Sequence, residues 1–150
     1  GDDAGIDLNA KVGSMTLSEA SPMYDEISTI LRETDTNYLV IQIGSSSGKE
    51  TAFFAKQFPQ HVFIGTDIYE EVVEYSSQFH NYSNLSFVKC SAKEIENLKN
   101  YKDSRFSQVL IFSSDSLQYV QPEHMTIIFN SLGQFGKLEI LILEPANESK

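Results

Sequence analysis

Short apolar runs alternate along the chain with segments whose apolar residues recur every three or four positions. A continuous apolar run is typical of a strand covered on both faces, whereas the longer period indicates an amphipathic helix. The runs predict strands at residues 38–43, 61–66, 85–89, 107–112 and 138–143. The helical pattern predicts a first helix that begins at Ser21–Pro22. It predicts further helices over residues 49–58, 70–80, 92–100 and 122–132.

The inward face of each predicted helix follows from the same spacing. The second helix should bury Thr51, Phe54, Ala55 and Phe58 before Pro59 ends it, and the third should turn Val72, Val73, Tyr75 and Phe79 inward.

Strands that alternate with helices predict an α/β fold. Right-handed crossovers would place helices on both faces of one parallel sheet, a doubly wound, Rossmann-like arrangement. We expect the strand order 3-2-1-4-5, with a switch point between the first and fourth strands. Residues 1–20 are polar and irregular, and residues 21–150 form a single predicted domain.

The most informative segment is the loop Gly44-Ser45-Ser46-Ser47-Gly48, which joins the first strand to the following helix. Glycine suits a loop whose backbone must turn sharply and come close to a ligand. The second strand then ends in Asp67, whose carboxylate is placed to accept the two hydroxyls of a ribose. Together the loop and the acid predict a nucleotide-binding site.

Composition narrows the function classes. The 150 residues carry a formal net charge of −10 without a cluster of lysine or arginine, which disfavours nucleic acid as a partner. No apolar stretch is long enough to span a membrane, and the single cysteine, Cys90, cannot form an internal disulfide. The three histidines lack the spacing of a metal site. We therefore expect a cytoplasmic protein without a bound metal.

Five segments resemble, in order, those of the class I S-adenosylmethionine-dependent methyltransferases: residues 41–48, 64–68, 87–92, 106–120 and 132–138. The resemblance runs from about Tyr38 to Leu143. It implies S-adenosyl-L-methionine as cofactor, S-adenosyl-L-homocysteine as product and methyl transfer to a small-molecule acceptor. It assigns cofactor binding to Gln42, Gly44, Ser45, Ser46, Gly48, Asp67, Ile68, Ser91, Ala92 and Ser113. Asp115 would be a catalytic base, and Tyr119 would orient the substrate.

The cofactor motif departs from the family pattern and is degenerate. Gln42 stands where the family usually has a carboxylate that holds the ammonium group of the cofactor. Ser46 replaces the middle glycine, and Ser91 replaces the acid at the adenine edge. Three weakened contacts of about 1 kcal/mol each predict binding weaker by roughly two orders of magnitude.

Other readings of these residues stay open. The loss of the acid at Gln42 favours a non-catalytic methyltransferase-like domain that serves as an interaction or regulatory module of a larger protein. An NAD-dependent role is a third possibility, although the loop is Gly-x-x-x-Gly rather than Gly-x-Gly-x-x-Gly. Asp67 could instead cap the following helix, and the two glycines could serve packing alone. Cys90 reads as a small buried apolar residue.

The predicted strand 138–143 would form an apolar edge of the sheet. Such edges pair readily with other chains unless they are covered. Methyltransferases of this class have two further strands after the fifth, and this sequence ends before them. We therefore expect a covering domain or a homodimer contact at this edge.

Overall fold

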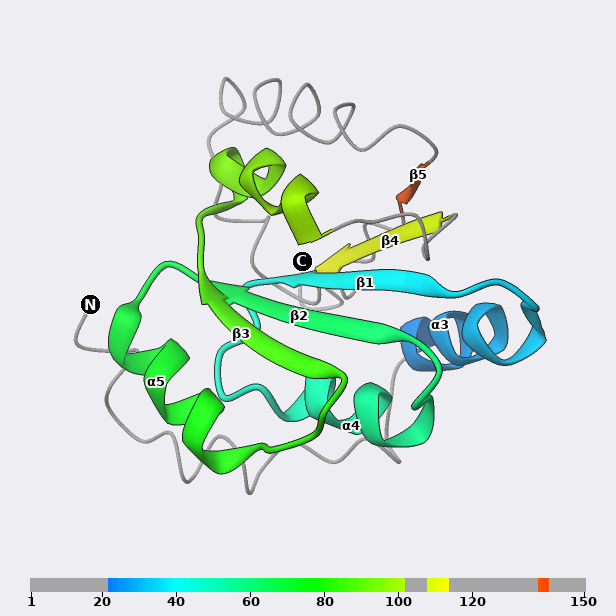
Figure 1. The fold of residues 1–150 in the computed structure, drawn as a ribbon, viewed down its shortest axis with the longest axis horizontal. Coiled ribbons are helices and arrows are strands. Elements are labelled where there is room, and N and C mark those ends of the chain that lie inside the picture. Colours follow the sequence, from blue (N-terminus) through cyan, green and yellow to red (C-terminus); the bar gives the residue numbers. More distant parts are fainter. Residues whose placement is uncertain (1–21, 102–107, 114–137, 141–150) are drawn as a thin grey trace, which may run out of the picture.

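The computed structural model describes residues 22–101, 108–113 and 138–140. Figure 1 shows helices on both sides of a sheet. The elements follow in the order α3 (Pro22–Glu33), β1 (Tyr38–Ile43), α4 (Lys49–Gln57), β2 (Val62–Asp67), α5 (Glu70–Phe79), β3 (Leu85–Lys89), the 3-10 helix η2 (Ala92–Tyr101), β4 (Gln108–Ser113) and β5 (Leu138–Ile140). The predicted elements within these ranges are therefore present, with β2 and β4 displaced by one residue.

The sheet has the order β3-β2-β1-β4-β5, and every pairing between neighbours is parallel. This confirms the predicted Rossmann-like fold and strand order. β1 lies at the centre, where Ile43 is in register with Thr66 of β2 and Ser113 of β4. The carboxyl ends of the central strands consequently meet at one edge, at the switch point of the sheet.

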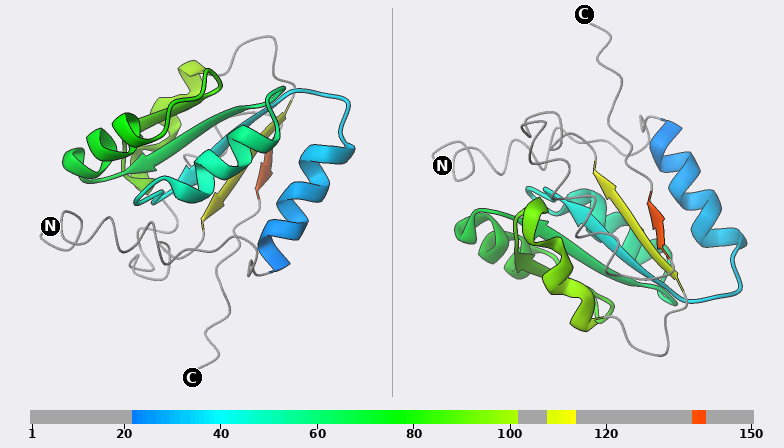
Figure 2. Two further views of the ribbon diagram at one scale, coloured as in Figure 1. Left: turned by 90° about the horizontal axis from the view of Figure 1, so that it is seen from below. Right: turned by 90° about the horizontal axis from the view of Figure 1, so that it is seen from above.

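Side chains that alternate along β1 divide the core into two layers. One layer packs Leu39, Ile41 and Ile43 against Ile95 and Leu98 of η2. The other packs the opposite face of β1 against α3 and α4 and contains Tyr24, Ile27, Leu31, Tyr38, Val40, Phe54, Ala55 and Phe58. Figure 2 shows this second face covered by α4, with α3 and α5 on either side of it.

α5 corrects one prediction about inward-facing residues. Val72 is buried, but Phe79 is 55% exposed and stacks on Tyr75 with ring centroids 5.5 Å apart. The buried position near the end of the helix is Ser76, whose hydroxyl donates to the carbonyl oxygen of Ser46 at 2.9 Å. The last helical turn therefore presents Ser76, and not Phe79, to the loop.

Two further expectations have different outcomes. Cys90 is buried in the first core layer, as predicted, and burial together with the nearby Glu94 raises the pKa of its thiol to about 11. The first three residues of the predicted strand 138–143 form β5, whereas residues 141–143 and the predicted helix 122–132 lie outside the described residues. Within the described ranges, no helix combines the length and apolarity needed to cross a bilayer.

His61 ties β1, β2 and α3 together in a neutral form. Its Nδ1 accepts the backbone N–H of Tyr38 at 2.9 Å, so the proton resides on Nε2, which donates to the Leu31 carbonyl at 3.0 Å. The ring is fully buried, and this burial lowers its pKa below 6.5, while the hydrogen bond to Leu31 opposes the shift. Protonation of Nδ1 would place its N–H against the N–H of Tyr38, and this hydrogen bond would be lost.

We expect the free energy of unfolding to fall as the pH drops below 6.5. The folded state binds fewer protons than the unfolded state there, so His61 contributes its full stability only above the unfolded pKa. The decline should not exceed about 1.4 kcal/mol per pH unit for this group. Urea unfolding of the wild type and of His61→Gln between pH 7.5 and 5.5 measures it.

Partial burial also lowers the pKa of His80. Its titration would add to the pH dependence of the unfolding free energy and must be separated from that of His61. A His80→Gln background isolates the contribution of His61. Equal pH slopes with and without His61 in that background would contradict the prediction.

Candidate functional site

The loop Gly44–Gly48 takes a left-handed backbone at three positions. Gly44, Ser46 and Gly48 have φ values of 69°, 52° and 81°. Glycine adopts this conformation without penalty, whereas a residue with a Cβ loses about 1–2 kcal/mol. Ser46 therefore preserves the loop backbone expected of a glycine, at a cost in stability.

The loop packs closely against β2 and β3. The backbone N–H of Ser45 donates to the Thr66 carbonyl at 2.7 Å. A Cβ added to Gly65 would lie 2.6 Å from the Phe87 ring and 2.8 Å from Ser45 Oγ. A Cβ on Gly48 would lie 2.7 Å from the same ring. The packing role suggested for glycine thus holds at Gly48, and Gly65 adds a second position that the sequence motif did not single out.

α5 fixes the loop from its other side. The Ser76 hydroxyl bonds the carbonyl of Ser46, and His80 Nε2 lies 3.0 Å from the carbonyl oxygen of Ser47. Since a carbonyl only accepts, Nε2 of His80 carries the proton. The backbone of the loop is therefore held by side chains before any ligand binds.

Asp67 lies at the carboxyl end of β2, beside the loop. Its Oδ2 accepts the Ser46 N–H at 3.0 Å, and its Oδ1 accepts the Tyr69 N–H at 3.2 Å. The alternative role as a helix cap is wrong, because Tyr69 is the N-cap of α5 and makes no side-chain capping bond. Asp67 stays partly exposed, and the next residue, Ile68, is 53% exposed. The predicted juxtaposition of loop and acid is confirmed.

Gln42 occupies an enclosed position on the α4 side of β1. Its side chain is fully buried, its Nε2 donates to Glu50 Oε1 at 2.8 Å, and its Oε1 accepts from the Thr51 hydroxyl. Tyr24 of α3 donates to Glu50 Oε2 at 2.5 Å. Burial, followed by the adjacent carboxylate, raises the pKa of the Tyr24 hydroxyl above its ordinary value.

Glu50 was not among the residues predicted for the site. It lies in the first turn of α4, and only 6% of its surface is exposed. Its spacing of eight residues from Gln42 gave no signal, because nothing in the sequence shows that a strand residue and a helix residue meet across the loop. A polar residue in an apolar strand was the one available hint.

The residues predicted to bind the adenine edge, Ser91 and Ala92, lie at the start of η2. Ser91 Oγ donates to Glu94 Oε1 at 2.9 Å, and the Glu94 N–H returns a bond to the Ser91 carbonyl at 3.0 Å. The Ser91 N–H also donates to Glu94 Oε1, at 3.3 Å, and the hydrogen bonds from Ser91 lower the pKa of Glu94. The Cys90 N–H donates to the Asp67 carbonyl at 2.9 Å, which brings this turn next to the end of β2.

Of the four other predicted residues, the structure describes two. Ala92 begins η2, and Ser113 ends β4 and is fully buried. Asp115 and Tyr119, the predicted catalytic residues, lie outside the described residues.

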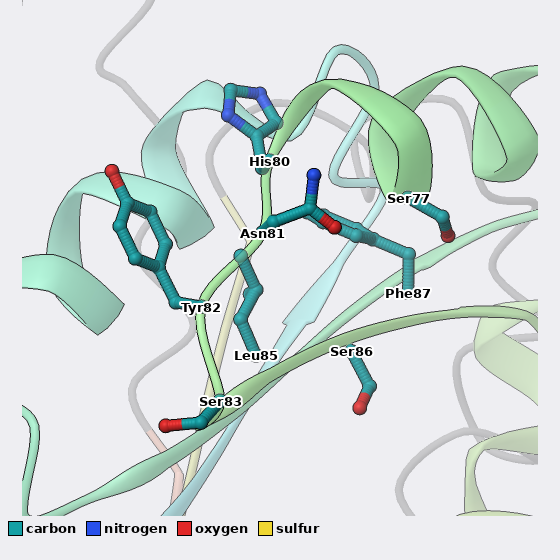
Figure 3. A pocket seen from close by; sticks show the side chains of 8 residues that line it. All are labelled: Ser77, His80, Asn81, Tyr82, Ser83, Leu85, Ser86 and Phe87. Atoms are coloured by element: carbon teal, nitrogen blue, oxygen red, sulfur yellow. The ribbon is translucent and has the colours of Figure 1, made fainter.

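An open hollow lies elsewhere, at the C-terminal end of α5 and along β3. Figure 3 shows the eight residues that line it: Ser77, His80, Asn81, Tyr82, Ser83, Leu85, Ser86 and Phe87. None of the predicted site residues belongs to it. The candidate site is therefore the strand-end region around Asp67 and the loop, and not this hollow.

The parallel 3-2-1-4-5 sheet, with a glycine loop after β1 and an acid at the end of β2, gives the chain the Rossmann-like fold of nucleotide-binding proteins. Residues 36–133, more than half of the chain, match the model of a family described as "Putative methyltransferase". The chain belongs to this family. A search of curated proteins finds no match.

Solved structures of methyltransferases share the fold. An S-adenosylmethionine-dependent methyltransferase from Anabaena variabilis ATCC 29413 has a TM-score of 0.62 at 16% identity, over 92% of this chain and 60% of that one. One from Mesorhizobium loti has a TM-score of 0.57 at 13% identity, over 79% and 50%. PKMT2 from Rickettsia typhi, solved in complex with AdoHcy, has a TM-score of 0.52 at 18% identity, over 65% and 18%. This chain thus matches at most about three fifths of these relatives.

Proposed function

We propose that this protein binds S-adenosyl-L-methionine and transfers its methyl group to a small-molecule acceptor. The observation that carries the proposal is the bond between Asp67 Oδ2 and the Ser46 N–H, which joins the strand-end acid to the glycine loop at the switch point of the sheet. Ligands of doubly wound proteins bind at this point. The family and the fold both support methyl transfer.

The described residues fit this cofactor. A carboxylate can accept more hydrogen bonds than the two that Asp67 receives, and its partial exposure makes it accessible to ribose hydroxyls. Ile68 presents apolar surface directly beside it, suited to a nucleobase. Gly44 and Ser46 of the loop are partly exposed, so a ligand could reach the loop at these two positions.

In this proposal the cofactor supplies an electrophilic methyl group on a sulfonium. The contribution of the chain is mainly alignment of donor and acceptor, because proximity and orientation lower the barrier of a displacement. Asp67 and the loop would hold the nucleoside. Asp115 would take the proton of an oxygen or nitrogen nucleophile, and Tyr119 would orient it. These last two roles rest on the family resemblance.

Calorimetric titration with S-adenosyl-L-methionine and S-adenosyl-L-homocysteine tests the proposal. We expect saturable binding with Kd values below about 1 mM, weaker than an intact motif would give. NAD serves as the control ligand and should give no heat. Absence of binding and of any thermal shift at millimolar cofactor would favour the non-catalytic module, the second candidate, which the uncharged and enclosed Gln42 supports.

A further inference from the structure

The open hollow at the C-terminal end of α5 has the size and the lining of a small-molecule site. Its volume of about 510 Å³ lies within the range of pockets that hold small ligands. None of its lining residues is an acid, a lysine or an arginine, although the chain carries a formal net charge of −10. A charged ligand would therefore find no partner of opposite sign in this hollow.

The polar groups of the lining are available to a ligand. Among the described residues, no protein group bonds the side-chain hydroxyls of Ser77, Tyr82, Ser83 and Ser86. The Asn81 amide donates through Nδ2 to the Gln78 carbonyl at 3.2 Å, which leaves its Oδ1 as an acceptor. Figure 3 shows Ser77 and Tyr82 on opposite sides of Asn81. Since hydroxyls both donate and accept, this set matches a ligand that carries several hydroxyls of its own.

Aromatic and apolar surface accompanies these hydroxyls. Tyr82 is 40% exposed, and Leu85 and Phe87 are partly exposed at the hollow. A sugar ring carries C–H groups on its faces and hydroxyls around its rim. The C–H groups can pack on a phenol or phenyl ring, while the hydroxyls bond the serines and the amide. An uncharged carbohydrate therefore fits this lining better than an ion or a purely apolar molecule.

Two residues of the hollow also contact the glycine loop. His80 Nε2 donates to the Ser47 carbonyl at 3.0 Å. A Cβ added to Gly48 would lie 2.7 Å from the Phe87 ring and 3.1 Å from His80 Cδ2, so both rings pack directly on the loop. Nδ1 of the neutral His80 ring is an acceptor that no described residue uses. A ligand hydroxyl bonded to Nδ1 would hold the ring in the orientation that fixes the loop.

We propose that this hollow is a second ligand site, which binds an uncharged carbohydrate, and that His80 and Phe87 transmit its occupancy to the loop Gly44–Gly48. The site is separate from the strand-end region around Asp67. Its effect on cofactor affinity rests on the proposed function, whereas carbohydrate binding itself does not.

NMR titration of the ¹⁵N-labelled chain with the methyl glycosides of glucose, galactose, mannose and ribose tests the site. We expect at least one glycoside to bind with a Kd between about 0.1 and 10 mM. It should shift the backbone amide signals of Ser86 and Phe87 and, through the contacts with the loop, those of Ser47 and Gly48. The methyl glycoside of glucuronate, a sugar ring with a carboxylate, should bind at least about 3-fold more weakly than that of glucose, because no cation lines the hollow.

A pair of amide variants provides the matched control. Asn81→Ala removes an acceptor from the lining and should weaken glycoside binding by about 5-fold or more. Gln78→Ala removes an amide that lies one turn away and outside the lining, and it should change the affinity by less than about 2-fold. Thermal unfolding shows whether both variants are folded.

Cofactor affinity provides a second measurement. Saturating glycoside should tighten S-adenosyl-L-homocysteine binding by about 3- to 10-fold, because the loop is already held when the cofactor arrives. Unchanged affinity, or unchanged amide signals of Ser47 and Gly48 on glycoside binding, would overturn the transmission to the loop.

Two results would overturn the carbohydrate site itself. They are no binding of any of the four uncharged glycosides at about 50 mM and equal losses of affinity in folded Asn81→Ala and Gln78→Ala. Wild-type protein that binds a glycoside but no S-adenosyl-L-homocysteine would refute the proposed function and support the carbohydrate site.

Discussion

Replacing Asp67 with alanine is expected to weaken S-adenosyl-L-homocysteine binding by about 30- to 150-fold. A carboxylate that accepts two ribose hydroxyls contributes about 2–3 kcal/mol to binding. The same side chain holds the Ser46 N–H, so its loss also removes a restraint on the loop. Calorimetric titration of Asp67→Ala measures the combined effect.

Two further variants separate these contributions. Asp67→Asn keeps one acceptor for the Ser46 N–H and should fall between the wild type and Asp67→Ala. Glu71→Ala removes an exposed carboxylate from the first turn of α5 and should bind like the wild type. If Asp67→Ala binds with wild-type affinity while folded, Asp67 has no part in ligand binding.

Gly65→Ala is expected to destabilise the protein by about 1–3 kcal/mol, the usual cost of forcing additional volume into a packed core. Its new methyl group would lie 2.6 Å from a ring carbon of Phe87, a separation that requires the ring or the strand to move. The free energy of unfolding in urea provides the measurement. Because the Ser45–Gly48 loop packs on the same surface, ligand affinity should fall as well.

A Phe87→Ala background distinguishes steric overlap from backbone strain. Without the aromatic ring, Gly65→Ala should cost at least about 0.5 kcal/mol less than in the wild type, and the cost that remains comes from the 2.8 Å approach of the new methyl group to Ser45 Oγ. Gly48→Ala should remain costly by about 1–2 kcal/mol in that background, because its φ of +81° disfavours any Cβ. Equal costs of Gly65→Ala in both backgrounds would contradict the steric explanation.

Much of the fold could be predicted because its signals are local. The apolar run Tyr38–Ile43 and the alternation of strands and helices specify a parallel sheet, and the strand order follows from a switch point between the first and fourth strands. The meeting of Asp67 with the loop follows in turn, because neighbouring parallel strands end at the same edge. Phe79 was assigned to the wrong face because helical spacing alone does not show that the polar Ser76, and not the aromatic Phe79, contacts the loop.

The sequence by itself determined the class of fold, the position of the loop and the acid at its side. Only the tertiary structure decided that Gln42 faces Glu50, that Gly65 makes room for Phe87, and that Ser91 bonds the carboxylate of Glu94. Periodicity and motif spacing describe residues within one element or its direct neighbours. Contacts between a strand, a helix and a loop depend on how side chains from separate elements pack, and this packing arises only when the sheet and its helices come together.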